Sequence, residues 1–247
     1  MQKKVQKQIE KLKKSFHSTN DFSSRIFISK KGTIGFVFLK SMIDAELFSQ
    51  AIYLPIQQWQ GQIDISSLMN KILKNNGVEE VAESEIEKNI LDGKVILFSD
   101  FFEGYISVDI TKYPTRTPSE PPTSPVIQGP REGFVEDFKT NMTLLRRRLH
   151  TKDLVFSTLI VGEKSQTKVV VSYIDGVADK RVIREVKKKI ENIKIDGVVD
   201  SYYILSYLEK RPNSLFKQIG NSEKPDIVAA KMLEGKVAII VDNSPIV

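Results

Sequence analysis

Apolar residues recur at helical spacing through the first sixteen positions. They are four, three and four residues apart and therefore share one helical face: Val5, Ile9, Leu12 and Phe16. Six lysines share this segment with a single acidic residue, Glu10. A basic amphipathic helix of this kind can lie on an anionic membrane. Because its apolar side has only one aromatic residue, we favour a helix that docks on the rest of the protein.

Strand and helix patterns alternate over residues 21–112, which predicts an α/β unit. Strands are expected at residues 25–29, 34–39, 94–99 and 104–110. Helices are expected from Asp44 to a stop near Pro55, and over residues 66–75 and 79–91.

Composition changes at residue 113. Five of the ten prolines fall within residues 113–125, and proline both fixes φ and removes a hydrogen-bond donor. This segment predicts a semi-rigid connector between two domains. We therefore divide the chain into a basic N-terminal helix (1–20), an α/β subdomain (21–112), a Pro-rich linker (113–128) and a second α/β subdomain (129–247).

The second subdomain is expected to open with a long helix that starts at Gly129-Pro130 and ends with three arginines at 146–148. Strands are predicted over residues 153–161, 168–174 and 236–241, and helices over residues 179–192 and 226–233. The inward face of the 179–192 helix is assigned to Val182, Val186 and Ile190. Residues 201–207 fit either a strand or a helix.

The two halves of the chain contain related segments. Residues 90–95 (ILDGKV) and 232–237 (MLEGKV) each predict the end of a helix, an acidic-glycine turn and a buried strand. A weaker echo relates residues 41–44 (SMID) to 172–175 (SYID), each placed after a strand and before a helix. The repeat predicts two related small α/β units, each a sheet covered by helices.

Composition restricts the chemistry. The chain has no cysteine and only two histidines, which excludes disulfides, thiolate zinc sites and sites built from several imidazoles. No apolar run reaches the length of about 18 residues that a membrane span needs. The net charge of +6 is modest, so we expect a solvated surface and no nucleic-acid partner. No metal, cofactor or catalytic signature is found, and we expect no enzyme activity.

Two other segments were tested for chemistry. Residues 162–165 (GEKS) superficially resemble a phosphate-binding loop, but the upstream glycine is absent and a strand follows, so we expect a hairpin turn. Residues 129–136 (GPREGFVE) combine glycines, proline, opposed charges and an aromatic side chain. They could form a helix cap and hinge, or a junction at which free helix N–H groups capture an anion or small molecule.

Several of these segments together resemble the A subunits of GerA-type spore germination receptors. The similarity is strong from about Arg116 onward, and it rests on residues 116–121 (RTPSEP), 129–136, Asn141, 146–148, 173–176, 195–197, 200–201, 224–226, 233–237, Asp242 and Pro245. The resemblance implies a soluble N-terminal region of a longer membrane protein, and we expect membrane helices to follow in the full-length protein. It also implies B and C subunits as partners, the inner spore membrane as location with this domain on the spore-core side, and a response to nutrients such as amino acids or sugars.

On this basis the chain is expected to take part in germinant sensing, signal transduction and receptor assembly. Two alternatives remain: a module that itself binds an amino acid or sugar in a cleft between the two lobes, and a scaffold for the B and C subunits. Candidate ligand-binding or hinge residues, carried over from the family-like motif, are Gly129, Pro130, Arg131, Glu132, Gly133, Phe134, Glu136, Arg116 and Glu120.

Overall fold

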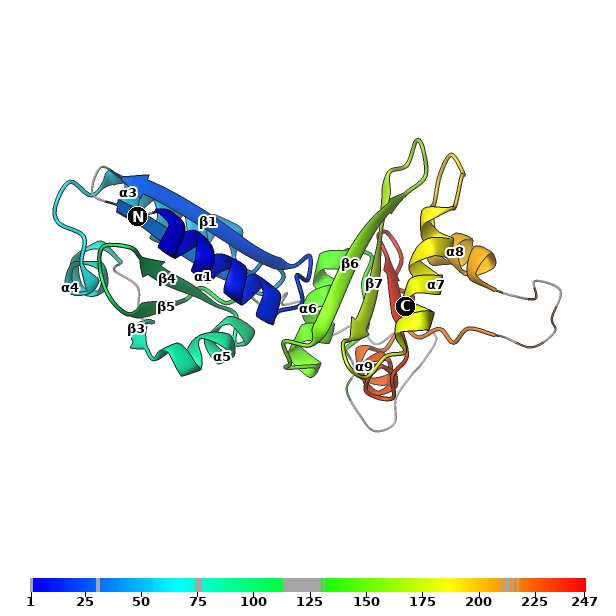
Figure 1. Cartoon of the computed structure of the whole chain (residues 1–247). Helices are drawn as coiled ribbons and strands as arrows, with labels where there is room; N and C mark the ends of the chain where they lie inside the picture. Colours follow the sequence, from blue (N-terminus) through cyan, green and yellow to red (C-terminus); the bar gives the residue numbers. More distant parts are fainter. Residues whose placement is uncertain are drawn as a thin grey trace. The chain divides into compact units, whose positions relative to one another are not determined.

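The computed structural model of the chain falls into two compact units, Met1–Tyr113 (unit 1) and Pro114–Val247 (unit 2) (Figure 1). The structure describes residues 2–29, 32–73, 77–112, 130, 132–209, 211, 214, 216 and 218–247. The predicted Pro-rich linker lies outside these residues.

Unit 1 is built on one five-stranded sheet. Its elements in chain order are α1 (Gln2–Ser15), β1 (Phe22–Ser29), β2 (Gly32–Leu39), α2 (Ala45–Leu47), the π-helix η1 (Phe48–Tyr53), α3 (Leu54–Gln58), α4 (Ile65–Ser67), the π-helix η2 (Leu68–Ile72), β3 (Val78–Val81), the 3-10 helix η3 (Glu83–Glu85), α5 (Ile86–Leu91), β4 (Lys94–Ser99) and β5 (Tyr105–Asp109). The strand order is β1-β2-β4-β5-β3, and every neighbouring pair is antiparallel.

Side-chain alternation along the central strands supplies two cores. Phe36 of β2 and Leu97 of β4 are paired in register and face the helices between residues 45 and 72. Val37 and Ile96 point to the other face, where α1 and α5 pack. Helices therefore cover both faces of this sheet.

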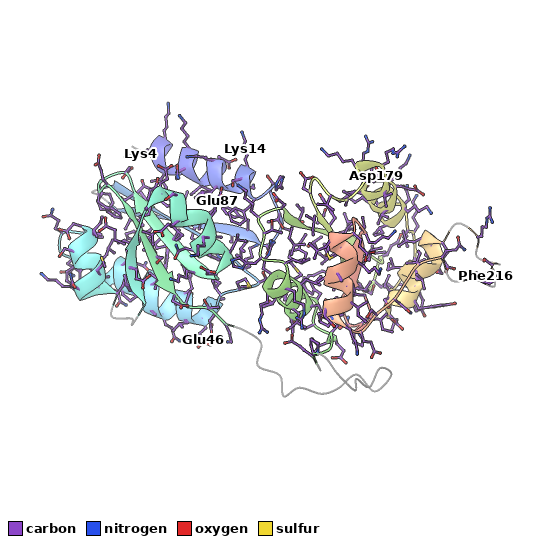
Figure 2. All side chains as sticks on the ribbon, turned by 90° about the horizontal axis from the view of Figure 1, so that it is seen from below. Lys4, Lys14, Glu46, Glu87, Asp179 and Phe216 are labelled. Atoms are coloured by element: carbon purple, nitrogen blue, oxygen red, sulfur yellow. The ribbon has the colours of Figure 1, made fainter. Side chains whose placement is uncertain are left out.

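The N-terminal helix docks on unit 1, as we favoured. Its stripe of Val5, Ile9, Leu12 and Phe16 is buried in the second of these cores. Lys4 and Lys14 point outward from the opposite side of α1 (Figure 2). The Ser15 hydroxyl donates a hydrogen bond to Glu87 of α5. The apolar stripe is thus already in contact with the sheet.

Two predictions in unit 1 were wrong. The helical turns do not stop at Pro55: the π-helix η1 runs directly into α3, which ends at Gln58, although Pro55 has no N–H to donate. The expected helix over residues 79–91 begins only at Ile86, because Val78–Val81 pairs with β5 as a strand. Tertiary pairing outweighs local propensity there.

Unit 2 has one three-stranded antiparallel sheet of order β6-β7-β8. Its elements are α6 (Phe138–Arg148), β6 (Leu154–Val161), β7 (Thr167–Ile174), α7 (Lys180–Glu191), α8 (Ser201–Leu208), α9 (Pro225–Leu233) and β8 (Ala238–Val241). One face, with Phe156 and Ile240, packs against α6 and α9. The other, with Val171 and Val241, packs against α7 and α8.

Residues 162–165 form the turn of the β6–β7 hairpin, as predicted. Gly162 adopts φ = +92°, a conformation that L-residues with a Cβ atom rarely adopt. Ser165 Oγ accepts a hydrogen bond from the Val198 N–H at 3.0 Å. On α7 the inward face carries Ile183 in place of Val182, which is 45% exposed.

The principal repeat is confirmed in three dimensions. Both α5 and α9 end before a glycine of positive φ, Gly93 (+83°) and Gly235 (+87°), and a strand follows each. In each unit that strand lies antiparallel beside the second strand of a hairpin, β4 beside β2 and β8 beside β7. The weaker similarity, between residues 41–44 and 172–175, is not structural. Residues 41–44 follow β2, whereas Ser172 lies within β7.

Candidate functional site

Residues 132–136 belong to no helix or strand, and the chain bends at Glu136. Helix α6 begins eight residues after the predicted start, because Asp137 caps it by accepting the Thr140 N–H at 2.9 Å. The Asn141 side chain holds both backbone groups of Val135, accepting its N–H at 2.8 Å and donating to its carbonyl at 2.5 Å. The anion-capture alternative needs a helix N-terminus beside Pro130, and among the described residues no helix begins there.

The motif residues anchor this segment to unit 2. Glu132 forms ion pairs with Arg148 at 2.6 Å and with Arg147 at 3.2 Å, both in the last turn of α6. Phe134 is buried in the core, and its N–H donates to the Glu223 carbonyl at 2.8 Å. These contacts join the segment to both ends of the unit's sequence.

The other candidates contribute less. Pro130 and Glu136 are exposed, Gly133 is half-buried, and the Glu136 carbonyl accepts the Asn243 N–H at 2.8 Å. The remaining candidates lie outside the described residues: Arg116, Glu120, Gly129 and Arg131.

The three arginines at the end of α6 differ in burial and in their partners. Arg146 is fully buried, although we expected all three to complement the helix dipole. Its guanidinium donates to the carbonyls of Thr151 and Leu154 at 3.0 Å each, and it lies 4.9 Å from the centroid of the Phe156 ring. It therefore fixes the turn from α6 into β6.

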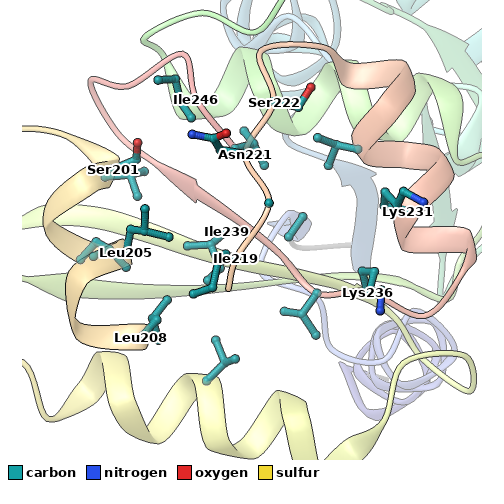
Figure 3. A pocket seen from close by; sticks show the side chains of 18 of the residues that line it. Ser201, Leu205, Leu208, Ile219, Asn221, Ser222, Lys231, Lys236, Ile239 and Ile246 are labelled. Atoms are coloured by element: carbon teal, nitrogen blue, oxygen red, sulfur yellow. The ribbon is translucent and has the colours of Figure 1, made fainter. Parts of the chain in front are cut away.

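A pocket of about 860 Å³ lies within unit 2 (Figure 3). It is bordered by α7, α8, α9, strand β8 and the segments 218–222 and 246–247. Its wall is mainly aliphatic and includes Val186, Ile204, Leu205, Leu208, Ile219 and Ile239. The volume falls in the range of sites that hold small organic ligands, about 300–1,000 Å³.

Most polar groups of the pocket already have partners. The Lys189 amine donates to the Leu208 carbonyl at 2.8 Å and lies 3.8 Å from Glu185. Lys231 pairs with Glu234 at 2.8 Å. Aliphatic contact is therefore the chief interaction that most of this wall offers.

Asp200, at the edge of the pocket, is held ionised. Burial alone would raise its pKa, but hydrogen bonds from the hydroxyls of Ser201 and Ser244 outweigh that effect, so the pKa lies below its ordinary value. The Ser244 hydroxyl bonds both Asp200 and Ser201 at 3.0 Å. This network ties the start of α8 to the C-terminal residues.

The end of the chain completes the pocket. Ser222 and Val247 exchange two backbone hydrogen bonds, of 2.8 and 3.0 Å. Ile246 and Val247 thereby become part of the wall. This site is not predictable from sequence patterns, because its wall is assembled from six separate stretches and residues 218–222 have no periodic pattern.

The described part of the chain contains neither a metal-binding cluster nor a membrane-spanning helix. There, no three histidine, cysteine, aspartate or glutamate side chains are grouped so that they could hold a metal ion. None of the described helices is both long enough and apolar enough to cross a membrane.

The architecture matches that of a solved protein domain. The chain has the fold of the N-terminal domain of the A subunit of the Bacillus megaterium spore germinant receptor GerK3, with a TM-score of 0.72 at 23% identity over 96% of this chain and 91% of that one.

Residues 10–247 match the family described as Bacillus/Clostridium GerA spore germination protein, and the chain belongs to that family. It is similar to the "Uncharacterized membrane protein YfkQ" of Bacillus subtilis (strain 168), with 34% identity over 98% of this chain and 48% of the relative. It is also similar to spore germination protein GerQA of Bacillus cereus, with 32% identity and the same coverage. The chain spans about half the length of these curated relatives.

Proposed function

We propose that this chain is the N-terminal domain of the A subunit of a spore germinant receptor. In this role it takes part in nutrient sensing, signal transduction and receptor assembly. The observation that carries the proposal is the family match over residues 10–247, and the fold shared with the GerK3 domain supports it. Its partners are the B and C subunits in the inner spore membrane, with this domain on the spore-core side.

The proposed role is binding and coupling and not catalysis. The names of several relatives refer to germination, including GerQA and germination protein B1 of Bacillus subtilis. A ligand shifts a conformational equilibrium only through different affinities for the two states. A pocket whose wall includes a segment held by few hydrogen bonds is a suitable place for such a difference.

The C-terminal residues supply that contact. Ile246 and Val247 form part of the pocket wall while the Ser222–Val247 backbone pair holds them. A ligand that touches this wall favours the paired state of the segment. Because the relatives are about twice as long as this chain, we propose that the C-terminal segment carries the signal onward in the full-length receptor.

The motif segment has a second part in the proposal. Glu132 and its two arginines hold the start of the segment 132–136 against the last turn of α6. We assign the segment from Gly129 to Glu136, with Arg116 and Glu120, the role of a hinge that limits the positions open to the connector.

Spores test the proposal directly. In the bacterium that encodes the chain, the gene is deleted and restored with wild-type or Glu132→Gln full-length protein, and germination is followed by loss of optical density on a panel of single nutrients. We expect the deletion to abolish or slow the response to at least one nutrient and the wild-type gene to restore it. Unchanged germination on every nutrient that wild-type spores answer would overturn the proposal.

The same spores separate signalling from assembly. Immunoblots for the B and C subunits show whether the receptor still accumulates. With Glu132→Gln we expect normal subunit levels and a slower response, since only the hinge contact is lost. Lys194→Gln, an exposed change in unit 2 away from the motif, is the matched control.

A further inference from the structure

We propose that the unit 2 pocket binds a small molecule with an aliphatic body and a single anionic head, of which a monocarboxylate is the simplest example. The inference deepens the proposed sensing function. The biological role of this binding rests on that function. The binding itself depends on the contacts of the pocket alone.

The body of the ligand follows from the wall. Leu205, Ile219 and Ile239 are half-buried and face the hollow from three different segments. Covering such partly exposed aliphatic surface is favourable in proportion to the area removed from water. The space along this wall suits a chain of several carbons better than a compact polar molecule.

The charge of the head follows from the remaining polar groups. Lys236 lines the pocket, and among the described residues no carboxylate pairs with it. The other two lysines of the wall have carboxylate partners, and Asp200 is occupied by hydroxyl donors. Asp200 keeps its negative charge but caps the start of α8, on the opposite side of the pocket from Lys236. The unpaired side-chain charge on the α9 side of the wall is therefore positive.

The two features lie at opposite sides of the pocket. Figure 3 places Lys236 and Lys231 on the side of α9, whereas Leu205 and Leu208 project from α8 across from them. Ile219 and Ile239 lie between the two sides. An elongated ligand can thus place its anionic end at Lys236 while its hydrocarbon crosses the apolar wall.

This arrangement selects against free amino acids. The ammonium group of a zwitterion sits one bond from the carbon that bears its carboxylate, so it would be held beside Lys236. Like charges at short distance repel. The available carboxylate on this side, Glu234, is paired with Lys231. A monocarboxylate avoids this repulsion.

The test is a titration of the 247-residue chain with octanoate at pH 7, followed by amide chemical shifts in NMR. We expect saturable shifts that cluster at residues 204–208, 219–222, 236–239 and 246–247. Shortening the ligand to hexanoate weakens binding by up to about fourfold for each methylene removed. Octylamine, which reverses the charge of the head, binds much more weakly than octanoate.

Two lysine variants sharpen the test. Lys236→Gln should weaken octanoate binding by up to about fivefold, the upper limit for an exposed charge pair, and leave the amide spectrum otherwise native. Lys194→Gln removes an equally exposed lysine of unit 2 that does not line the pocket, and should change nothing. Absence of saturable shifts at millimolar octanoate, equal binding of octylamine, or equal loss in both variants would overturn the inference.

Spores that carry Lys236→Gln separate this inference from the proposed function. If the variant weakens octanoate binding in the purified chain while nutrient germination is normal, the pocket binds its ligand for a purpose other than germinant sensing. If the chain fails to bind octanoate but deletion of its gene still abolishes a nutrient response, the ligand class is wrong and the receptor role stands.

Discussion

Replacing Arg146 with alanine should destabilise unit 2 more than any other single change in its arginine run. The side chain is fully buried at the end of α6. Its guanidinium supplies hydrogen bonds to two backbone carbonyls, those of Thr151 and Leu154, and stacks on Phe156. Alanine leaves both carbonyls without this donor and opens a void over the aromatic ring.

The size of the effect can be worked from these contacts. A hydrogen bond to a charged donor contributes about 1.5–3 kcal/mol, and a cation–π contact about 0.5–2 kcal/mol. Part of the total is recovered when water or neighbouring atoms relax into the space. We therefore expect a loss of about 4 kcal/mol in the free energy of unfolding. For a unit of this size that corresponds to a fall in Tm of roughly 15 °C.

Thermal unfolding read by two probes provides the assay. Trp59, the single tryptophan, lies in unit 1 and reports that unit by fluorescence, while far-ultraviolet circular dichroism reports both units. We expect Arg146→Ala to lower the Tm of the unit 2 transition and leave the Trp59 transition in place. Arg147→Ala is the control, because its ion pair with Glu132 is exposed and contributes about 0–1 kcal/mol. A loss for Arg146→Ala no larger than that of Arg147→Ala would refute the reasoning.

Three further outcomes are expected. Gly235 has φ = +87°, and Gly235→Ala places a Cβ 3.0 Å from a backbone carbonyl, so it should lower the free energy of unfolding, measured in urea, by about 2 kcal/mol. Gly176→Ala, at φ = +82° with open space around it, should lower it by about 1 kcal/mol. Equal losses would contradict the role of the close contact. Phe16→Ala should cost unit 1 about 3–5 kcal/mol by Trp59 fluorescence, and Lys14→Ala less than about 0.5 kcal/mol; a tolerated Phe16→Ala would mean that α1 does not depend on its apolar stripe. A hydrogen bond from Lys112 and bonds from the helix N–H groups lower the pKa of Asp44. The contribution of Asp44 to the free energy of unfolding is therefore complete above about pH 4 and is lost as the pH falls through the lowered pKa. Asp44→Asn should make stability depend less on pH in this range, and an unchanged pH profile would contradict this role of Asp44.

Local signals were sufficient where sequence neighbours decide the structure. The stripe of α1, the cap at Asp44 and the glycine turns before β4 and β8 all depend on residues within a few positions of one another. Local signals were not sufficient for Val78–Val81, because only its pairing with β5 makes this segment a strand. The same limit explains why the burial of Arg146 was not predicted. The arginines that follow it are exposed or half-buried, and nothing in the sequence distinguishes Arg146 from them.

The candidate site was less predictable than the fold. The family-like motif drew attention to residues 129–136, yet its described members anchor a segment and do not line the unit 2 pocket. The pocket is created by stretches that meet only after α8, α9 and the C-terminal residues have packed around β8. Apolar side chains in such stretches have the same pattern whether they cover a core or border a cavity, and three-dimensional packing alone distinguishes the two.

The position of β8 affects how unit 2 is made on the ribosome. Both cores of the unit include residues of this strand, Ile240 on one face and Val241 on the other. Neither face is complete until nearly every residue of the unit has left the exit tunnel. Unit 1, in contrast, has all five of its strands by residue 109. Synthesis therefore produces a finished first unit beside a second one whose hairpin waits for its last strand, and a nascent chain arrested before residue 238 should display that hairpin unprotected.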